Sequence, residues 1–528
     1  MKHHVVGLLL WILLASILSV PSVFCLEPQF IGDADDAAAS LINILRRKGV
    51  LSATEAAALL ARQEQQKQMP VAQERTITII PEGQTYLDKI STNVARDIKK
   101  DVQARLDTEM KSYVNEMESG SSWKHRIRWG GDIRLRYQGD RFDELNAILR
   151  DPDDTSKIMN TTEDRDRGRI RVRLAVKAKI NENVEAGVKI ATGNERDPVS
   201  SNDTFGDYQN SDDVVLLQAY LKWNKEMDFW DRYLDVALWG GRIPNPWFSS
   251  SLVWDVDLNF EGAALQINPK FNDNLSGFMT IGAFPLQEVE LSQNDKWLYG
   301  GQLGVNMTTG KNVNAQFGVA YYDYENTVGK VNPLASSPVN DWTAPLYQQK
   351  GNTLMDINPA LNTINNLFIP GNITTALASE FTELNITSKL DLAFFDPVHV
   401  IFLADYVRNL AFDRKEVMLR AGLTESELPE DLDEGYQFGC TVGHPKVRSS
   451  GAWKVFFTYK YLEADAVLDA FTDSDFHLGG TNAKGWIMGA DYGLADNFWL
   501  TAKWLSSDEI DGPQIAIDTL MLDLNAEF

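Results

Sequence analysis

One short stretch constrains the fold of this chain more than any other: residues 167–180 read RGRIRVRLAVKAKI. Basic side chains alternate there with apolar ones, so in a β-strand one face is charged and the opposite face is apolar. A soluble sandwich would turn the apolar face toward a core. A membrane barrel would turn it toward lipid and keep the charged face in an aqueous interior.

The same alternation recurs from Trp123 to the end of the chain, and the connections decide between the two folds. Short connections such as 181–183 alternate with long ones such as 138–168 and 324–380, as periplasmic turns and extracellular loops do in a membrane barrel. A compact soluble domain rarely contains so long an internal gap. We therefore predict an all-β transmembrane β-barrel of about 16 antiparallel strands over residues 121–528. The predicted strands lie near 127–137, 169–180, 184–192, 214–223, 232–242, 257–268, 275–283, 297–307, 313–323, 381–392, 397–407, 435–443, 451–462, 483–493, 498–505 and 515–528.

Residues 1–25 are typical of a signal peptide, because a basic residue precedes the apolar run 5–20 and small residues follow it. An uncleaved anchor is one alternative. A lipoprotein acylated at Cys25 is another, and bulky Phe24 argues against it. After removal of the signal Cys440 would be the only cysteine, so no internal disulfide could form. No later apolar run approaches the roughly 18 residues that a helical span requires.

Between the signal and the barrel the sequence predicts a small α-helical region. Residues 26–70 predict a helical hairpin whose first helix ends at Gly49. Residues 71–120 predict a linker and a long helix from about 85 to 117. Its apolar residues recur mostly every four positions, so the apolar stripe winds around the helix. A right-handed coiled-coil stalk and a solvated helix packed on its neighbours both fit this pattern.

The last residues, LMLDLNAEF, alternate apolar and polar side chains and finish on an aromatic residue. This ending resembles the C-terminal strand of bacterial outer-membrane barrels, whose final aromatic resembles the signal read by the barrel-assembly machinery. The residues that carry the resemblance are Leu520, Leu522, Leu524 and Phe528. Ile515 and Ile517 lie out of phase with Leu520, which a bulge or a later strand start would explain.

Several segments together resemble the "Putative porin" family of Gram-negative bacteria. They are the hairpin LINILRRKGVLSATEAAALL, the linker helix, the two arginine-rich first strands and GRIPNPWFSSSLVWDVDLNFEGAAL. The resemblance covers the whole chain after the signal. It implies an outer-membrane channel that forms a homotrimer, contacts lipid and lipopolysaccharide, and has its N-terminal helices in the periplasm.

A barrel of about 16 strands is too wide for side chains to fill, so its interior stays wet. Charged residues that alternate with lipid-facing ones then line the pore, because a cation facing lipid near the midplane would cost about 2–4 kcal/mol. We expect a basic wall that favours small anions or sets up a field against acidic groups. The alternative is that these charges only solvate the lumen. The predicted pore-lining residues are Arg128, Arg134, Arg136, Arg169, Arg171, Arg173, Lys177, Lys179, Lys189, Asp235, Glu383 and Asp391.

Two segments are candidates to narrow such a pore: the insertion 324–380, rich in Asn and Pro, and the segment 241–257. Most of the acidic residues fall in the long loops. These loops either bind divalent ions that bridge lipopolysaccharide or form a plain solvated surface, and they lack the regular calcium-loop spacing.

The predicted function is passive diffusion of ions and small hydrophilic solutes through a water-filled outer-membrane channel. The alternative is a structural protein that tethers the envelope through its periplasmic helices, and deletion of residues 26–120 would distinguish the two. A net charge of −24 argues against nucleic acid as a partner. The histidines show no ligand spacing and no nucleophile–base arrangement is evident, so we expect no metal, no cofactor, no catalytic residue and no enzyme activity.

Overall fold

The structure, a computed structural model, describes residues 126–528 apart from 150–156, 230–231, 291, 334–337, 359–362, 365–366, 369–373 and 429. The predicted signal peptide, helical hairpin and linker helix lie outside the described residues.

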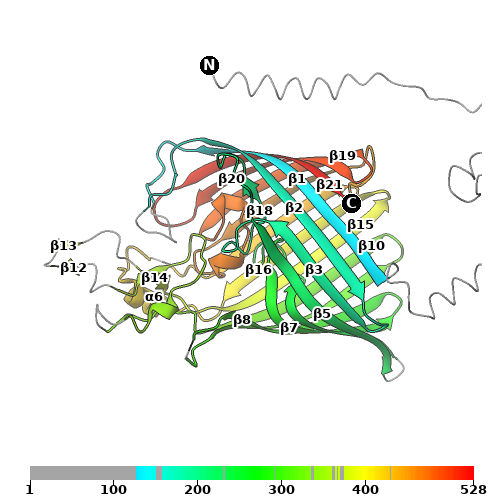
Figure 1. Cartoon of the computed structure of the whole chain (residues 1–528), viewed down its shortest axis with the longest axis horizontal. Coiled ribbons are helices and arrows are strands. Elements are labelled where there is room, and N and C mark those ends of the chain that lie inside the picture. The colour runs from blue at the N-terminus through cyan, green and yellow to red at the C-terminus, as the bar shows by residue number, and fades with distance from the viewer. Residues whose placement is uncertain are drawn as a thin grey trace, which may run out of the picture. The chain divides into compact units, whose positions relative to one another are not determined.

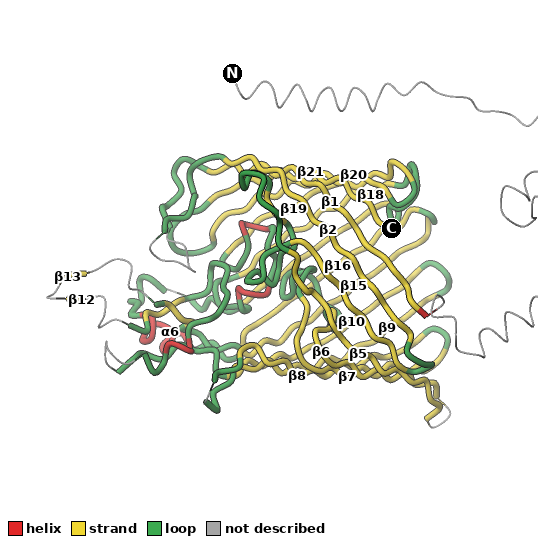
Figure 2. Tube along the Cα trace, viewed as in Figure 1, coloured by secondary structure: helices red, strands yellow, loops and turns green. Residues whose placement is uncertain are grey.

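Sixteen antiparallel strands close into a barrel (Figures 1 and 2). Each strand pairs with the next along the chain, and the last pairs with the first from Asp132 opposite Glu527 to Phe142 opposite Ile517. Closure satisfies the backbone hydrogen bonds of both edge strands, as a lipid environment requires. The wall strands are β1 (Ile127–Phe142), β2 (Arg165–Lys179), β3 (Val184–Thr192), β5 (Val214–Phe229), β6 (Arg232–Pro244), β7 (Asn259–Asn272), β8 (Leu275–Gln287), β9 (Lys296–Thr309), β10 (Val313–Glu325), β15 (Thr382–Phe395), β16 (Val398–Asn409), β17 (Glu434–Gly443), β18 (Trp453–Leu462), β19 (Ala483–Ala495), β20 (Phe498–Glu509) and β21 (Ala516–Glu527).

The predicted fold class is confirmed, and each of the sixteen predicted strands corresponds to a strand of the wall. The main difference lies at the strand ends, since β1 and β2 run several residues farther than predicted. Apolar alternation fades there, but polar contacts across the inner face continue the pairing. Arg167 Nη2, for example, donates to Asp140 Oδ2 at 2.6 Å, and Thr519 Oγ1 of β21 donates to Asp140 Oδ1 at 3.1 Å.

The alternation along the strands gives the wall two faces. Large apolar side chains such as Leu135, Leu238 and Leu303 are exposed on the outer face, where lipid would cover them. The intervening side chains face the lumen, and many of them are buried against segments that fold into it.

The last strand corrects one sequence interpretation. β21 begins at Ala516 and keeps an unbroken register with both β1 and β20, so of the two explanations offered for Ile515 and Ile517 the bulge is not found. Ile517 lies on the inner face with Met521, and both are buried. Phe476 packs against Met521 there. The two isoleucines that are out of phase with Leu520 are therefore both buried.

The connections differ between the two ends of the barrel, as predicted. The chain turns within a few residues after β2, β5, β7, β9, β15 and β19, at the end that is periplasmic in barrels of this kind. The other end carries the long connections, including α6 (Arg414–Ala421), which packs on Met355, Ile357 and Ala376. It also carries the short strands β4 (Asp203–Thr204), β11 (Leu354–Asp356), β12 (Thr363–Ile364), β13 (Leu367–Phe368) and β14 (Thr375–Leu377), and the 3-10 turns η1 (Asp341–Thr343), η2 (Asp469–Phe471) and η3 (Phe476–Leu478). Among the described residues, no helix has both the length and the apolar character needed to cross a membrane.

Candidate functional site

The connection between β6 and β7, residues 245–258, folds into the lumen. Trp254 is buried and packs edge-on against Phe260 and Tyr322, with ring centroids 5.0 Å apart in each pair. The middle of the segment reaches across the lumen to β16, where Ser250 N donates to Asp405 Oδ2 at 3.0 Å. This segment overlaps 241–257, one of the two predicted constriction candidates.

The connection between β18 and β19, residues 463–482, also folds inward, and it is not among the segments expected from the sequence to narrow the pore. Leu468 N donates to Glu383 Oε1 at 3.1 Å, and Glu383 is fully buried. Hydrogen bonds join the two inward segments: Asp255 N donates to Phe471 O at 2.8 Å, and Ser474 N donates to Asp255 Oδ2 at 2.9 Å. The segment mixes small, polar and aromatic residues without a period, so it carried no recognisable signal.

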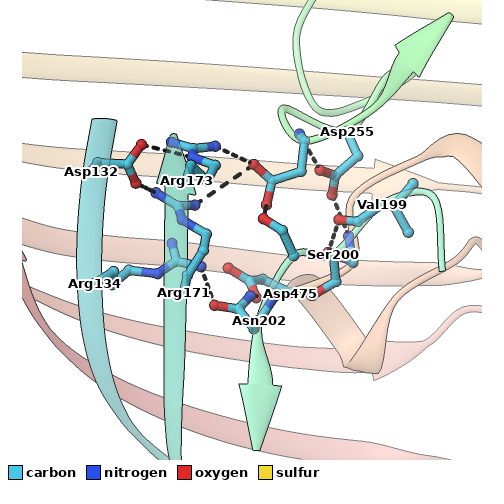
Figure 3. Close-up of polar contacts among 12 residues, drawn as sticks. Asp132, Arg134, Arg171, Arg173, Val199, Ser200, Asn202, Asp255 and Asp475 are labelled. Atoms are coloured by element: carbon cyan, nitrogen blue, oxygen red, sulfur yellow. Dashed lines mark hydrogen bonds and ion pairs between the residues drawn. The ribbon is translucent and has the colours of Figure 1, made fainter. Parts of the chain in front are cut away.

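Arginines of β2 form ion pairs directly with the inward segment 245–258 (Figure 3). Arg173 Nε lies 2.8 Å from Asp132 Oδ2, and its Nη1 lies 2.9 Å from Asp257 Oδ1. Arg171 shares both partners, with Nη2 3.0 Å from Asp132 Oδ1 and Nη1 3.6 Å from Asp257 Oδ1. Asp132 belongs to β1 and Asp257 to the inward segment, so this network ties the wall to the segment.

A second ion-pair network lies on the same wall. Arg136 Nε lies 2.7 Å from Asp523 Oδ1, and its Nη1 lies 2.8 Å from Asp475 Oδ1. Lys503 Nζ approaches the other oxygen of Asp475 at 3.4 Å. Burial alone would raise the pKa of Asp475, but the charges of Arg136, Lys503 and Arg134 outweigh it and hold the pKa of this carboxyl well below its ordinary value.

Two further predicted arginines have weaker partners. Arg134 donates to Asn202, and its Nη1 lies 4.0 Å from Asp523 Oδ2. Arg169 Nη1 donates to Gln138 Oε1 at 3.2 Å and makes no ion pair within the described residues. The Nε atoms of both are buried without a hydrogen-bond partner in the described part of the chain.

We call the part of the lumen where Arg171, Arg173 and Arg136 pair with carboxylates the constriction. The periplasmic half of the basic wall differs from it. Lys177 and Lys179 continue the inner face of β2, and Arg128 lies opposite Lys177 on β1. Lys189 of β3 lies opposite Ala175 of β2, on the same inner face. Within the described residues, none of these four cations has a hydrogen-bonded or ion-paired side-chain partner. The wall therefore divides into an ion-paired constriction and an unpaired basic stretch below it.

The three predicted acidic residues lie apart from this wall. Glu383 supports the segment 463–482. Asp391 Oδ1 lies 2.7 Å from His399 Nδ1, and Asp235 accepts a 3.5 Å hydrogen bond from Asn268. Whether all twelve predicted residues line the open path stays a prediction. Within the described residues, no group of three or more His, Cys, Asp or Glu side chains is arranged to hold a metal ion.

The other sequence candidates are placed as follows. Arg242, in the candidate segment 241–257, pairs with Glu261 and donates to Leu217 O at 2.9 Å, outside the constriction contacts. Leu520, Leu522 and Leu524 alternate along β21 opposite β1 and β20. Phe528 N donates to Gly131 O at 3.0 Å. Their role as an assembly signal stays a prediction.

A closed antiparallel barrel with an apolar outer face and a polar, narrowed lumen defines an outer-membrane β-barrel channel. The profile of the family described as "Putative porin" matches residues 35–528, and the chain belongs to that family. It forms a channel for passive diffusion across the outer membrane of a Gram-negative bacterium, which confirms the predicted function and location. Family and fold indicate a channel rather than an enzyme.

Several solved structures match this chain at low sequence identity. OprB of Pseudomonas putida, in its high-pH structure, is 11% identical over 77% of this chain and 95% of its own, with a TM-score of 0.43. The outer membrane channel DcaP of Acinetobacter baumannii is 12% identical over 77% and 98%, with a TM-score of 0.38. OmpF of Salmonella typhi, in complex with daunomycin, is 10% identical over 76% and 97%, with a TM-score of 0.38. No curated protein sequence matches the chain significantly.

Proposed function

We propose that this channel prefers small anions, and that the cations below the constriction set the preference. The observation that carries the proposal is the division of the basic wall. At the constriction Asp132, Asp257, Asp475 and Asp523 offset the arginine charges. Toward the periplasm, no carboxylate within the described residues pairs with Lys177, Lys179, Lys189 or Arg128. Unpaired charge in a low-dielectric passage concentrates counter-ions.

The test is a reversal-potential measurement on the refolded protein in a planar bilayer under a salt gradient. The triple variant Lys177→Gln, Lys179→Gln, Lys189→Gln should lower the anion-to-cation permeability ratio by about twofold or more. Lys311→Gln is the control, because Lys311 is an exposed lysine in the β9–β10 turn at the same end. An unchanged ratio in the triple variant would contradict the proposal.

We further propose that the protein works as a homotrimer embedded in outer-membrane lipid and lipopolysaccharide, as the family resemblance implies. The alternation of Leu520, Leu522 and Leu524 with a final Phe528 supports delivery by the barrel-assembly machinery. Phe528→Ala should reduce the fraction of folded barrel in isolated outer membranes, read from its electrophoretic mobility before heating. Native mass spectrometry of the extracted protein tests the trimer, and a monomer would contradict it.

A further inference from the structure

One connection at the periplasmic end is longer than its neighbours and folds inward. The turn between β17 and β18, residues 444–452, buries Val447. Asn497 N donates to Arg448 O at 2.8 Å, and Gly451 N donates to Gly493 O at 2.9 Å, so the turn is fixed to the β19–β20 hairpin. Arg448 also donates to Glu527 Oε1 of β21 at 2.7 Å. This turn brings Lys446 and Arg448 to the basic wall.

Between the turn and the constriction lies a cavity of about 540 Å³. Such a volume is within the range of about 300–1,000 Å³ typical of small-molecule sites. Its basic lining residues outnumber the acidic ones by six to three, and the excess remains if the carboxylate of Phe528 is counted. The basic residues are Arg171, Arg173, Lys189, Lys446, Arg448 and Lys454, and the acidic ones are Asp132, Asp491 and Glu527.

Two lysines of the lining have no ion-pair partner within the described residues, whereas the other basic residues are paired. Asp491 Oδ2 lies 2.9 Å from Lys454 Nζ, and Glu527 pairs with Arg448. Asp132 binds the two arginines of the constriction. Lys189 comes from the wall and Lys446 from the turn, and neither has an ion-pair partner within the described residues. Lys189 and Lys446 are therefore the two cations of the lining that lack an ion-pair partner within the described residues, one from β3 and one from the turn.

We propose that this cavity is a binding site for small organic anions that carry two or more negative charges, held between Lys189 and Lys446. The proposal rests on the proposed anion preference and deepens it by naming the class of solute. A dianion satisfies both ammonium groups at once, whereas a monovalent anion leaves one uncompensated. Charge-assisted hydrogen bonds from both lysines make the difference in affinity. The turn 444–452 is then a selectivity element at the channel exit, beyond the constriction.

The test uses citrate as the probe in single-channel recordings of the refolded full chain. Citrate on the periplasmic side should interrupt the chloride current, and acetate at equal ionic strength should not. Lys446→Gln and Lys189→Gln should each weaken the block by about tenfold, the effect expected for loss of one charged hydrogen bond. Lys311→Gln is the matched control for a periplasmic lysine outside the cavity, and it should leave the block unchanged.

Three outcomes would overturn the proposal: equal block by acetate and citrate, block that persists in both lysine variants, or equal weakening in the Lys311→Gln control. Lys446 is exposed and has no ion-pair partner within the described residues, so its replacement leaves the wall intact. Reversal potentials measured on the same channels separate the two proposals. If the channel prefers anions but citrate does not block it, only the proposed binding site at the exit is contradicted. If citrate blocks a channel that does not prefer anions, only the proposed anion preference is contradicted.

Discussion

At the scale of single residues, the role of each arginine of the wall depends on which residues lie opposite it and which carboxylates it pairs with. Arg134 lies directly opposite Arg171, and Arg136 directly opposite Arg169. Like charges in these positions repel and destabilise a sheet. The structure offsets this repulsion with carboxylates such as Asp523, which comes from β21. The arginines at the constriction therefore have a structural role as well as an electrostatic one.

The Arg136 network gives the first stability prediction. The Arg136 side chain is 0% exposed and that of Asp523 is 4% exposed. Arg136→Ala leaves two carboxylates without their main partner, so it should lower the free energy of unfolding by about 3–5 kcal/mol. Arg141→Ala is the control, since the exposed Arg141–Asp166 pair should contribute at most about 1 kcal/mol. Urea titration of the refolded barrel measures both, and equal losses would contradict the prediction.

His477 gives a pH prediction for the inward segment 463–482. Burial, followed by the Lys350 charge, lowers the pKa of His477 from 6.5 to about 4. The contribution of neutral His477 to stability is therefore full above pH 6.5 and is lost as the pH falls toward 4. Asp465 acts in the opposite direction, because burial raises its pKa to about 6. A comparison with a variant of His477 separates the pH-dependent contribution of His477 to stability from that of Asp465.

His477→Asn is the suitable variant, because His477 has a φ of 55° and asparagine tolerates this backbone conformation. From about pH 7 to about pH 4.5 the stability advantage of the unsubstituted protein over the variant should shrink by about 2–3 kcal/mol. Free energies of unfolding at both pH values measure it. A difference that stays constant would mean that His477 does not titrate in this range.

At the scale of elements, the inward segments exist because the wall alone cannot fill the lumen. A barrel of about 16 strands encloses more space than its own side chains occupy. Buried aromatic residues on the inner face of β8 and β10, such as Phe284 and Tyr322, therefore need partners from the connections. Residues 245–258 and 463–482 supply them, and Asp257 and Asp475 of these segments pair with arginines of β2 and β1.

Trp254 tests this arrangement. Its side chain is 1% exposed and lies in the same core cluster as Phe260 and Tyr322. Trp254→Ala should lower the free energy of unfolding by about 3–5 kcal/mol and loosen the segment, because a large buried ring is removed. Single-channel recordings should show a larger and noisier conductance. A conductance unchanged in size and noise would show that the segment does not limit the passage.

At the scale of the whole molecule, the barrel separates a lipid face from a water face. Leu303→Arg on β9 would place a cation on the outer face, at an expected cost of about 2–4 kcal/mol near the bilayer midplane. Asn306→Arg on the same strand, but on the inner face, should cost little, because lumen charges stay hydrated. Urea titrations of barrels refolded into phospholipid vesicles would measure both. Equal costs would contradict the assignment of the faces.

The sequence alone determined that the chain forms a barrel and where its strands lie. A strand repeats every two residues, so each apolar-polar alternation is readable locally, as in residues 167–180. The alternation also placed Arg169, Arg171 and Arg173 on one face. The sequence could not show which connections fold inward, since residues 463–482 have no periodicity and pack on residues more than a hundred positions away, such as Asn352 and Ser251.

Only the tertiary structure decided which cations of the basic wall are offset and which remain unpaired. Arg136 and Asp523 are 387 residues apart in the chain, and Arg173 and Asp257 are 84 apart. Ion pairing depends on distances of a few ångströms, which barrel closure and the inward segments set. The period of two fixes the face on which a charge lies, whereas its partner depends on the path of the whole chain through space.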